Sequence, residues 1–342
     1  MTGERFDAVV VGAGIAGTGT AYYLRKAGLS VALMDAHHPG WAASGRNPGF
    51  LWLQTKAAGL SMRFSLAARE FAGTLADAFP DFGFRACGGL IIYRDPAYEP
   101  VARAFVADRV AAGLAVELLD RTQLARLTPA IGPEVSGAVW NPLDAHQDTR
   151  RLLRHVADAF VAAGGKIDEK ACVSAVLTAG GHCRGVRLKD GREIAAPTVV
   201  IAGGPWSNDL LRPLDLAFPF LPTRFEAAET TVAPFRIEPV VAGQSLFRFF
   251  TPAGVDPASL PREPSELIRP ELGFTEQIAS LQDGSLQFGC AYEIGSDLDQ
   301  ATVAGQAMAC SIHSLNFPAV AALPVTRQWA GIVAQTPDGL PV

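Results

Sequence analysis

Three glycines and one acid near the N-terminus have the types and spacing of a nucleotide-binding site. Gly12, Gly14 and Gly17 form the pattern G-x-G-x-x-G, and Asp35 follows 18 positions after Gly17. Such glycines allow a tight turn and a close approach of the backbone to a diphosphate, while the acid accepts hydrogen bonds from ribose hydroxyls. Asp35 would also repel a 2′-phosphate, which disfavours NADP. An ordinary glycine-rich turn is the alternative.

A strand, a helix and a second strand are predicted around this motif. Residues 7–12, DAVVVG, are a short apolar run closed by glycine, which is typical of a buried parallel strand. Residues 15–27 predict a helix, and residues 30–35 predict a second strand. The turn that contains Ala13 therefore leads into a helix N-terminus, whose free N–H groups and positive dipole end favour phosphate.

A second candidate segment follows the predicted second strand. Ala43 to Gly49 reads ASGRNPG and supplies small residues, a hydroxyl, a guanidinium and backbone amides. Its candidate cofactor-binding residues are Ser44, Gly45, Arg46, Asn47 and Gly49. Arg46 could give charge-assisted hydrogen bonds to phosphate. A surface turn is the alternative, because Ser, Gly, Asn and Pro are turn formers.

Two later segments complete the set. Residues 198–207, TVVIAGGPWS, predict a buried strand that closes on two glycines, at the strand edge where open α/β folds bind ligands. Residues 325–342 read VTRQWAGIVAQTPDGLPV. Trp206 and Trp329 are as consistent with core packing as with ligand contact, since tryptophan is largely buried in most proteins.

Taken together, these motifs resemble the FAD-dependent oxidoreductases of the D-amino-acid oxidase superfamily. The SGRN-x-G loop, the AGGPWS strand end and the WAG-x-x-x-x-TPDGLPV segment carry the resemblance, which spans the whole chain. The nearest patterns are those of glycine oxidase, sarcosine oxidase β-type subunits, and opine oxidase and dye-linked proline dehydrogenase subunits. The cofactor implied is FAD.

The resemblance also implies a role for each matching residue. Gly12, Gly14 and Gly17 would meet the diphosphate and Asp35 the adenosine ribose. The segment from Ser44 to Gly49 would follow the cofactor towards the flavin. Further residues are expected along the cofactor: Val173 through its backbone on the adenine side, then Ala202, Gly203 and Trp206.

The sequence departs from the family pattern in two ways. Glycine oxidase-like members carry an arginine two residues after the glycine of the WAG segment, where it holds the substrate carboxylate, and this sequence has Val333 there. Lys56 or Arg248 could replace that cation, although a solvated surface charge is the alternative for each. Family members also continue beyond GLPV with a strand, turn and helix over the flavin. We expect this element to lie outside this sequence, to be missing, or to be supplied otherwise.

The order of predicted elements indicates an α/β (α+β overall) fold of two interleaved domains. A Rossmann-like FAD-binding domain with a parallel sheet is predicted from residues 1–83, 145–215 and 325–342. A substrate domain with a mostly antiparallel sheet is predicted from residues 84–144 and 216–324. Within the latter, the proline-rich residues 252–270 predict an exposed loop.

Composition excludes several classes of function. The net charge is -5 without a basic block, which argues against a nucleic-acid partner. The five cysteines show no metal-ligand or CxxC spacing, and we expect reduced thiols in a cytoplasmic protein with no metal. The sequence predicts no signal peptide and no membrane span. His146 is expected to be a loop histidine with satisfied hydrogen bonds.

Three hypotheses of function remain from the sequence. The first is FAD-dependent oxidation of a small amine or amino acid, by hydride transfer from the α-carbon to flavin N5. No catalytic triad, paired carboxylates or catalytic base is identified, and this mechanism does not require one. The second is a cofactor-binding but catalytically silent subunit of a hetero-oligomeric flavoenzyme, and the third is an NAD-dependent dehydrogenase. A partner subunit or a homo-oligomer is compatible with either of the first two.

Overall fold

The chain forms two compact units, each assembled from separate stretches of sequence. A computed structural model describes residues 4–79, 81–252, 254–268 and 272–339. Unit 1 comprises residues 1–47, 149–223 and 331–342, and unit 2 comprises residues 48–148 and 224–330. The predicted mixture of a parallel-sheet Rossmann-like region and a mostly antiparallel sheet is confirmed.

Unit 1 is built on a four-stranded parallel sheet in the order β12-β1-β2-β8. Its strands are β1 (Ala8–Val11), β2 (Val31–Met34), β8 (Lys166–Asp168) and β12 (Thr198–Ile201). All four residues of β1 and of β2 are buried. Such near-continuous apolar runs are expected of strands that are covered on both faces.

Alternate residues of β1 pack on opposite faces of this sheet. Ala8 and Val10 pack against helices α1 (Ile15–Lys26) and α6 (Thr149–Ala162), which contribute Ala21 and Phe160. Val9 and Val11 pack against an antiparallel sheet and the short helix α7 (Ser207–Leu211). The strands of that second sheet are β9 (Val173–Ala179), β10 (His182–Leu188) and β11 (Glu193–Ala195).

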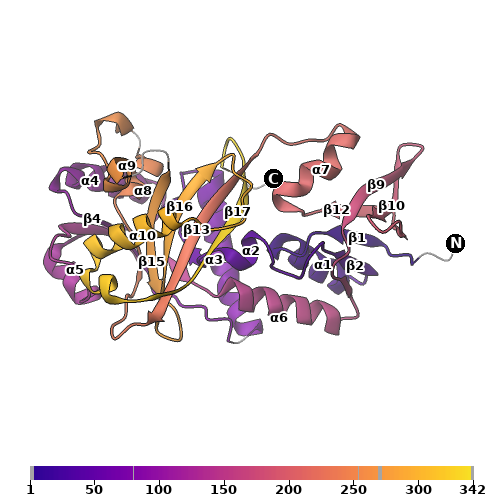
Figure 1. Cartoon of the computed structure of the whole chain (residues 1–342), viewed down its shortest axis with the longest axis horizontal. Coiled ribbons are helices and arrows are strands. Elements are labelled where there is room, and N and C mark those ends of the chain that lie inside the picture. Colours follow the sequence, from indigo (N-terminus) through magenta and orange to yellow (C-terminus); the bar gives the residue numbers. More distant parts are fainter. Residues whose placement is uncertain (1–3, 80, 253, 269–271, 340–342) are drawn as a thin grey trace. The chain divides into compact units, whose positions relative to one another are not determined.

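Unit 2 contains most of an eight-stranded sheet in the order β17-β13-β16-β15-β14-β4-β6-β5 (Figure 1). The strands are β4 (Gly89–Tyr93), β5 (Glu117–Asp120), β6 (Gly137–Asn141), β13 (Leu221–Val232), β14 (Val240–Ala242), β15 (Gly273–Ser280), β16 (Ser285–Ile294) and β17 (Val325–Gln335). The ladders β15–β16, β14–β15, β4–β6 and β5–β6 are antiparallel, whereas β14 pairs with β4 in parallel. Strands β13 and β17 each continue into unit 1.

Helices cover both faces of this sheet. Met308 and Ile312 of α10 pack with Leu90 and Phe288 on one face. Phe105 of α4 and residues of α8 pack on the other face. The helices of unit 2 are α3 (Leu60–Ala78), α4 (Glu99–Ala111), α5 (Arg121–Leu127), α8 (Ser245–Phe249), α9 (Pro264–Ile268) and α10 (Val303–Asn316).

The boundaries of the two units differ from the predicted domain boundaries. Residues 48–83 and 145–148 belong to unit 2 rather than to the unit with the parallel sheet. The physical reason is a small antiparallel ladder, in which β3 (Phe50–Leu51) pairs with β7 (Ala145–His146). Residues 325–330 also belong to unit 2, and residues 216–223 belong to unit 1. Which unit holds the cofactor and which holds the substrate stays a prediction.

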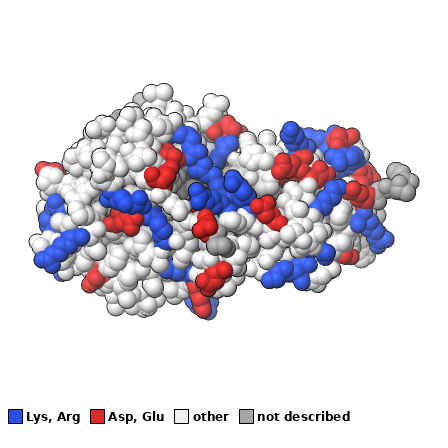
Figure 2. All heavy atoms as spheres, turned by 90° about the horizontal axis from the view of Figure 1, so that it is seen from below, with Lys and Arg blue, Asp and Glu red and all other residues white. Residues whose placement is uncertain are grey.

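The proline-rich segment 252–270 is not simply the exposed loop that the sequence predicted. Its described part contains helix α9, and Leu260, Glu263 and Ser265 are buried. Residues 253, 269 and 270 lie outside the described residues. Figure 2 shows one face of the molecule, where Lys and Arg side chains lie among Asp and Glu side chains.

Candidate cofactor site

The glycine-rich turn packs the ends of β1 and β12 against each other. Gly12 has φ of +103°, and a Cβ there would lie 2.3 Å from the Ala202 carbonyl oxygen. A Cβ on Gly17 would lie 1.8 Å from the carbonyl oxygen of Gly12. Both positions therefore require glycine, because any side chain would displace backbone. The turn, the start of α1 and the end of β12 form one closely packed surface of bare backbone.

The N-terminus of α1 has a hydroxyl group beside its free N–H groups. Helix α1 follows Gly14, which has no side chain to cap it. The Ile15 amide instead donates to Ser44 Oγ at 3.0 Å. Ser44 comes from the one-turn helix α2 (Ala43–Arg46). The remaining donors of the first turn and the positive end of the helix dipole make this position suitable for an anion.

Asp35 joins the glycine turn to the residues that follow β2. Its carboxylate accepts from the Ala13 amide at 2.7 Å and from the His37 amide at 2.7 Å. Because an ionised carboxylate offers about four acceptor positions, Asp35 can still accept from hydroxyl groups. Asp35 therefore fixes the turn through its hydrogen bond with Ala13 and also offers acceptor oxygens to a ligand.

These elements surround a cavity of about 710 Å³ in unit 1. It opens at the carboxyl ends of β1, β2 and β12, where parallel sheets bind ligands. Its volume lies within the range of about 300–1,000 Å³ that is usual for small-molecule sites. The predicted residues that line it are Gly12, Gly14, Asp35, Ser44, Val173, Ala202, Gly203 and Trp206.

Other predicted residues of unit 1 are not among those that line this cavity. They are Ala13, Gly17, Gly45, Arg46 and Asn47. Asn47 donates to the carbonyl oxygens of Ala43 and Ser44 and so caps helix α2. A Cβ on Gly45 would lie 2.1 Å from the Gly40 carbonyl oxygen. These residues shape the segment that carries Ser44.

An aromatic stack at the cavity was not predicted from the sequence. Trp41 stacks on His37 with ring centroids 3.7 Å apart and planes inclined by 11°. The Arg46 guanidinium lies 4.7 Å from the centroid of the Trp41 ring, and Trp206 lies 6.0 Å from it. His37 and Trp41 both line the cavity. The sequence shows only that these rings precede the SGRN segment, and no periodic pattern indicates that they stack.

Three predicted residues lie in unit 2 instead. Gly49 has φ of +75° and accepts from the Gln147 amide beside the β3–β7 ladder. Arg248 donates to the carbonyl oxygens of Leu260 at 3.0 Å and Pro261 at 2.7 Å, so its guanidinium is already engaged. Lys56 is partly buried, and this burial lowers the pKa of its ammonium group, opposed by the charge of Asp144.

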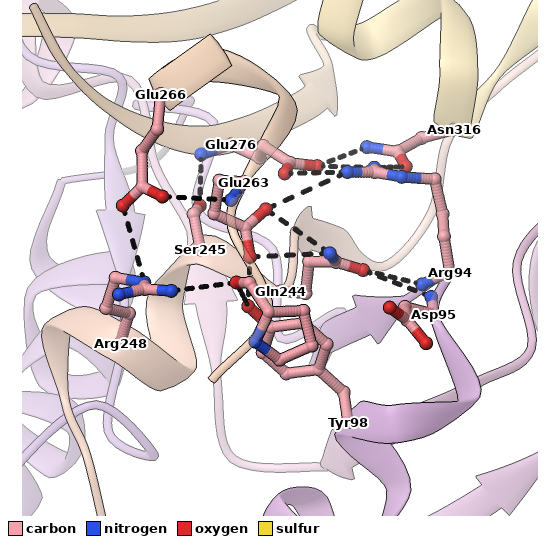
Figure 3. A network of polar contacts seen from close by, with 11 residues as sticks. Arg94, Asp95, Tyr98, Gln244, Ser245, Arg248, Glu263, Glu266, Glu276 and Asn316 are labelled. Carbon is pink, nitrogen blue, oxygen red and sulfur yellow. Dashed lines mark hydrogen bonds and ion pairs between the residues drawn. The ribbon is translucent and has the colours of Figure 1, made fainter. Parts of the chain in front are cut away.

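Unit 2 also contains a buried polar network that sequence reasoning missed (Figure 3). Arg94 pairs with Glu276 at 2.9 Å, and Glu263 accepts from Tyr98 and from Gln244. Burial, together with the charge of Glu276, raises the pKa of Glu263 to about 7. The groups of this network bind one another, so they attach the segment around α9 to the sheet.

His146 differs from its predicted environment. It belongs to β7, is 4% exposed, and its Nε2 has no hydrogen-bond partner among the described residues. Burial and the charge of Arg85 lower the pKa of His146 to about 4. The expectation of a satisfied loop histidine was wrong, because the β3–β7 ladder places this ring in the interior.

The described part of the chain contains neither a metal-binding cluster nor a membrane-spanning helix. No group of three or more His, Cys, Asp or Glu side chains there could hold a metal ion. No described helix has both the length and the apolar character needed to cross a membrane. The five cysteines are free thiols.

Comparisons with known proteins agree with this geometry. A family described as FAD dependent oxidoreductase matches residues 7–342. The glycine oxidase of Bacillus licheniformis is 26% identical over 231 residues, which cover 65% of this chain and 60% of that protein. The match therefore spans less than two thirds of that relative's length.

Solved structures show the same fold. The crystal structure of glycine oxidase from Geobacillus kaustophilus aligns with a TM-score of 0.85 and 20% identity, covering 99% of this chain and 85% of that chain. The L-proline dehydrogenase of P. horikoshii aligns with a TM-score of 0.82 and 21% identity, covering 99% and 84%.

Proposed function

The chain belongs to the FAD dependent oxidoreductase family, and on this premise we propose that it binds FAD in unit 1 and oxidises a small amine or amino acid. The observation that carries the proposal is the cavity at the carboxyl ends of β1, β2 and β12, lined by bare backbone and a helix start.

The residues present fit the chemical groups of FAD. Gly12 and Gly14 would let a diphosphate approach the backbone at the start of α1, where Ser44 adds a hydroxyl. Asp35 would accept from the adenosine ribose. The backbone of Val173 would border the adenine side, and Ala202, Gly203 and Trp206 would lie along the cofactor. Gly17 maintains the packing of α1 on the turn.

The segment after Ser44 would continue this contact with the cofactor. Gly45 and Asn47 hold the fold of α2, and Arg46 is placed over Trp41. Gly49 follows at the start of unit 2. In this proposal these residues fix the position of backbone amides rather than supply reacting groups.

FAD, when bound, supplies the acceptor for a hydride from the α-carbon of the amine. The protein's part is to bind the substrate with its amine neutral, to orient the α-carbon and to exclude water. The oxidised product is an imine, which water then hydrolyses. No protein base is needed for this sequence of events.

A visible absorbance spectrum before and after addition of amines tests the proposal. We expect flavin bands that bleach without air when a panel of D- and L-amino acids, sarcosine and opines is added. Flavin bands that no substrate bleaches would indicate a catalytically silent subunit. A colourless protein that stays colourless with added FAD, yet forms NADH from NAD and substrate, would overturn the proposal in favour of a nicotinamide enzyme.

A further inference from the structure

A pair of stacked aromatic rings forms part of the cavity wall in unit 1. The centroids of the His37 and Trp41 rings lie 3.7 Å apart, their planes are inclined by 11°, and both residues line the cavity. Nearly parallel rings at this distance are in van der Waals contact, so Trp41 covers one face of the His37 ring. The Arg46 guanidinium lies 4.7 Å from the centroid of Trp41, where the cation is attracted to the ring. Neither ring belongs to the motifs that carry the resemblance to the family.

Backbone hydrogen bonds hold His37 beside Asp35. The His37 amide donates to Asp35 Oδ1 at 2.7 Å, and the His37 carbonyl oxygen accepts from the Lys170 amide at 3.2 Å. The Ala171 amide donates to the Asp35 carbonyl oxygen at 2.8 Å. The chain from 35 to 37 is therefore tied to the chain at 170 and 171, and the His37 side chain starts from a fixed backbone.

A turn holds Trp41 against the glycine-rich loop. The Trp41 amide donates to the His38 carbonyl oxygen at 3.1 Å, which closes the turn. Within this turn, the Gly40 amide donates to the Ala13 carbonyl oxygen at 3.0 Å. A Cβ on Gly40 would lie 2.5 Å from Leu153 Cδ2, so the turn also packs closely on α6. Trp41 is therefore held in place by contacts within unit 1, and its ring supports the ring of His37.

The second face of the His37 ring is free to receive a planar group. His37 is exposed. In the part of the chain that the structure describes, its ring contacts no aromatic ring other than that of Trp41, and its ring nitrogens form no hydrogen bond with the protein. Residues 171–173 line the same cavity. A flat group of a ligand bound at Asp35 therefore has an open aromatic face and the backbone of 171–173 beside it.

We propose that the His37 ring stacks on the adenine of FAD, and that Trp41 is a positioning residue that holds His37 in this orientation. The inference rests on the proposed function, in which Asp35 accepts from the adenosine ribose, because the base is attached directly to that sugar. Every base has a π-face, and stacking of a base on an aromatic side chain is a general source of affinity. The glycine-rich turn would recognise the diphosphate, whereas the two rings add a preference for ligands that carry the base.

Binding titrations of the FAD-free, full-length protein and of the variants H37A, H37F and H38A test this inference. ADP is the probe, because it carries the adenosine and the diphosphate without the flavin, and pyrophosphate is its match without the adenosine. We expect H37A to raise the Kd for ADP about 5- to 150-fold, as removal of a stacked ring does, and to leave the Kd for pyrophosphate unchanged. H37F should bind ADP nearly as tightly as the wild type, since it keeps an aromatic face. H38A is the control, because His38 is exposed and is not among the residues that line the cavity.

Three results would refute the assignment of His37. Equal affinity of H37A and H38A for ADP would show that the ring does not contact the nucleotide. A loss of affinity in H37F as large as that in H37A would show that stacking is not the interaction. A loss of affinity for FMN in H37A, with ADP binding intact, would place the flavin rather than the adenine on this ring.

Proton NMR of bound ADP gives a readout that does not depend on affinity. Protons that lie over an aromatic face are shifted upfield by its ring current, so the adenine protons of bound ADP should move upfield with the wild type and H37F but not with H37A. W41L should reduce this shift, because His37 loses the ring that supports it, and W41F should restore the shift. An adenine shift in W41L equal to that of the wild type would show that Trp41 does not position His37.

The two proposals fail in different ways. If the wild-type protein binds neither FAD nor ADP, the proposed cofactor is wrong, whatever His37 does. If the wild type binds FAD and amines bleach it, but H37A binds ADP as tightly as the wild type, only the assignment of His37 is wrong.

Discussion

At the scale of single residues, the glycines of the first turn perform two separate tasks. Gly12 takes a positive φ that disfavours side chains, whereas Gly17 provides space inside α1 for the Gly12 carbonyl group. The sequence pattern predicted both glycines but could not separate these tasks. The two roles differ in which backbone atoms lie next to each Cα, and the spacing of glycines in the sequence does not show this.

The substitution G17A tests the close packing, and G19A is its matched control in the same helix. A Cβ at Gly17 would collide with the Gly12 carbonyl oxygen at 1.8 Å, whereas a Cβ at Gly19 would meet no atom within 4 Å. We expect G17A to lower the free energy of unfolding by at least about 2 kcal/mol and to abolish retention of FAD. G19A should raise the free energy of unfolding by about 0.5–1 kcal/mol, since alanine favours the helix.

Urea unfolding and the ratio of flavin to protein absorbance measure both effects. If G17A retained as much flavin and stability as G19A, the contact between α1 and the turn would not be needed for the site.

At the scale of elements, local sequence patterns predicted helices with a clear apolar repeat. They missed strands that are defined by pairing with residues distant in the sequence. Leu152, Leu153, Val156 and Phe160 repeat at helical spacing, which predicts a helix over 149–163, and helix α6 is found at Thr149–Ala162. The three-residue strand β8 was missed, since it is defined by its pairing with β2 rather than by its own composition.

The segment around α9 shows the same limit for the interior of unit 2. Its prolines predicted an exposed loop, yet Glu263 is 2% exposed. Tyr98 and Gln244 donate hydrogen bonds to Glu263, and the Arg94 guanidinium lies 4.0 Å from its carboxylate, so residues distant in sequence make this burial possible. Likewise, the stack of His37 on Trp41 depends on a loop conformation that has no sequence period.

Burial of Glu263 predicts a specific dependence of stability on pH. Its pKa rises from 4.5 in the unfolded chain to about 7 in the folded protein. Below pH 4.5 both states are protonated. Between pH 4.5 and about 7, Glu263 is ionised in the unfolded chain but still protonated in the folded protein. Its contribution to the free energy of unfolding therefore falls as pH rises. The loss is about 3 kcal/mol and is complete above the folded pKa.

The variant E263Q should reduce this decline, because glutamine keeps the shape of the side chain but cannot ionise. Denaturant unfolding at a series of pH values from 4 to 8 measures the slope. E99Q is the control, since Glu99 forms an exposed ion pair with Arg103 that contributes little to stability. The buried Asp144, whose pKa burial raises to about 7, adds the same trend to both variants. An unchanged slope in E263Q would show that the pKa of Glu263 is the same in the folded and unfolded states.

At the scale of the whole molecule, each unit is assembled from separate stretches of chain, so neither unit can be excised as one continuous fragment. Unit 1 combines three stretches, and β13 and β17 continue from one unit into the other. Strand-helix alternation occurs at the N-terminus of the sequence and returns near residue 150, which indicates two interleaved domains. The predicted boundary follows residue 83, whereas the division into units follows residue 47; the pairing of β3 with β7 near this division is a long-range contact that local patterns do not encode.

The assignment of the cofactor to unit 1 predicts where FAD changes local stability. FAD bound to the folded state alone stabilises it by RT ln(1 + [L]/Kd), about 2.7 kcal/mol at a hundredfold excess over Kd. The contacts lie at the turn after β1, at the start of α1 and after β12, so local opening there should be suppressed most.

Hydrogen exchange with and without FAD should therefore show the largest gain of protection in residues 12–18 and 202–207. The outer strands β5 and β6 of unit 2 should gain least, and G17A should show no gain anywhere. If FAD instead increased protection most in β5 and β6, the cofactor site would have to be assigned to unit 2.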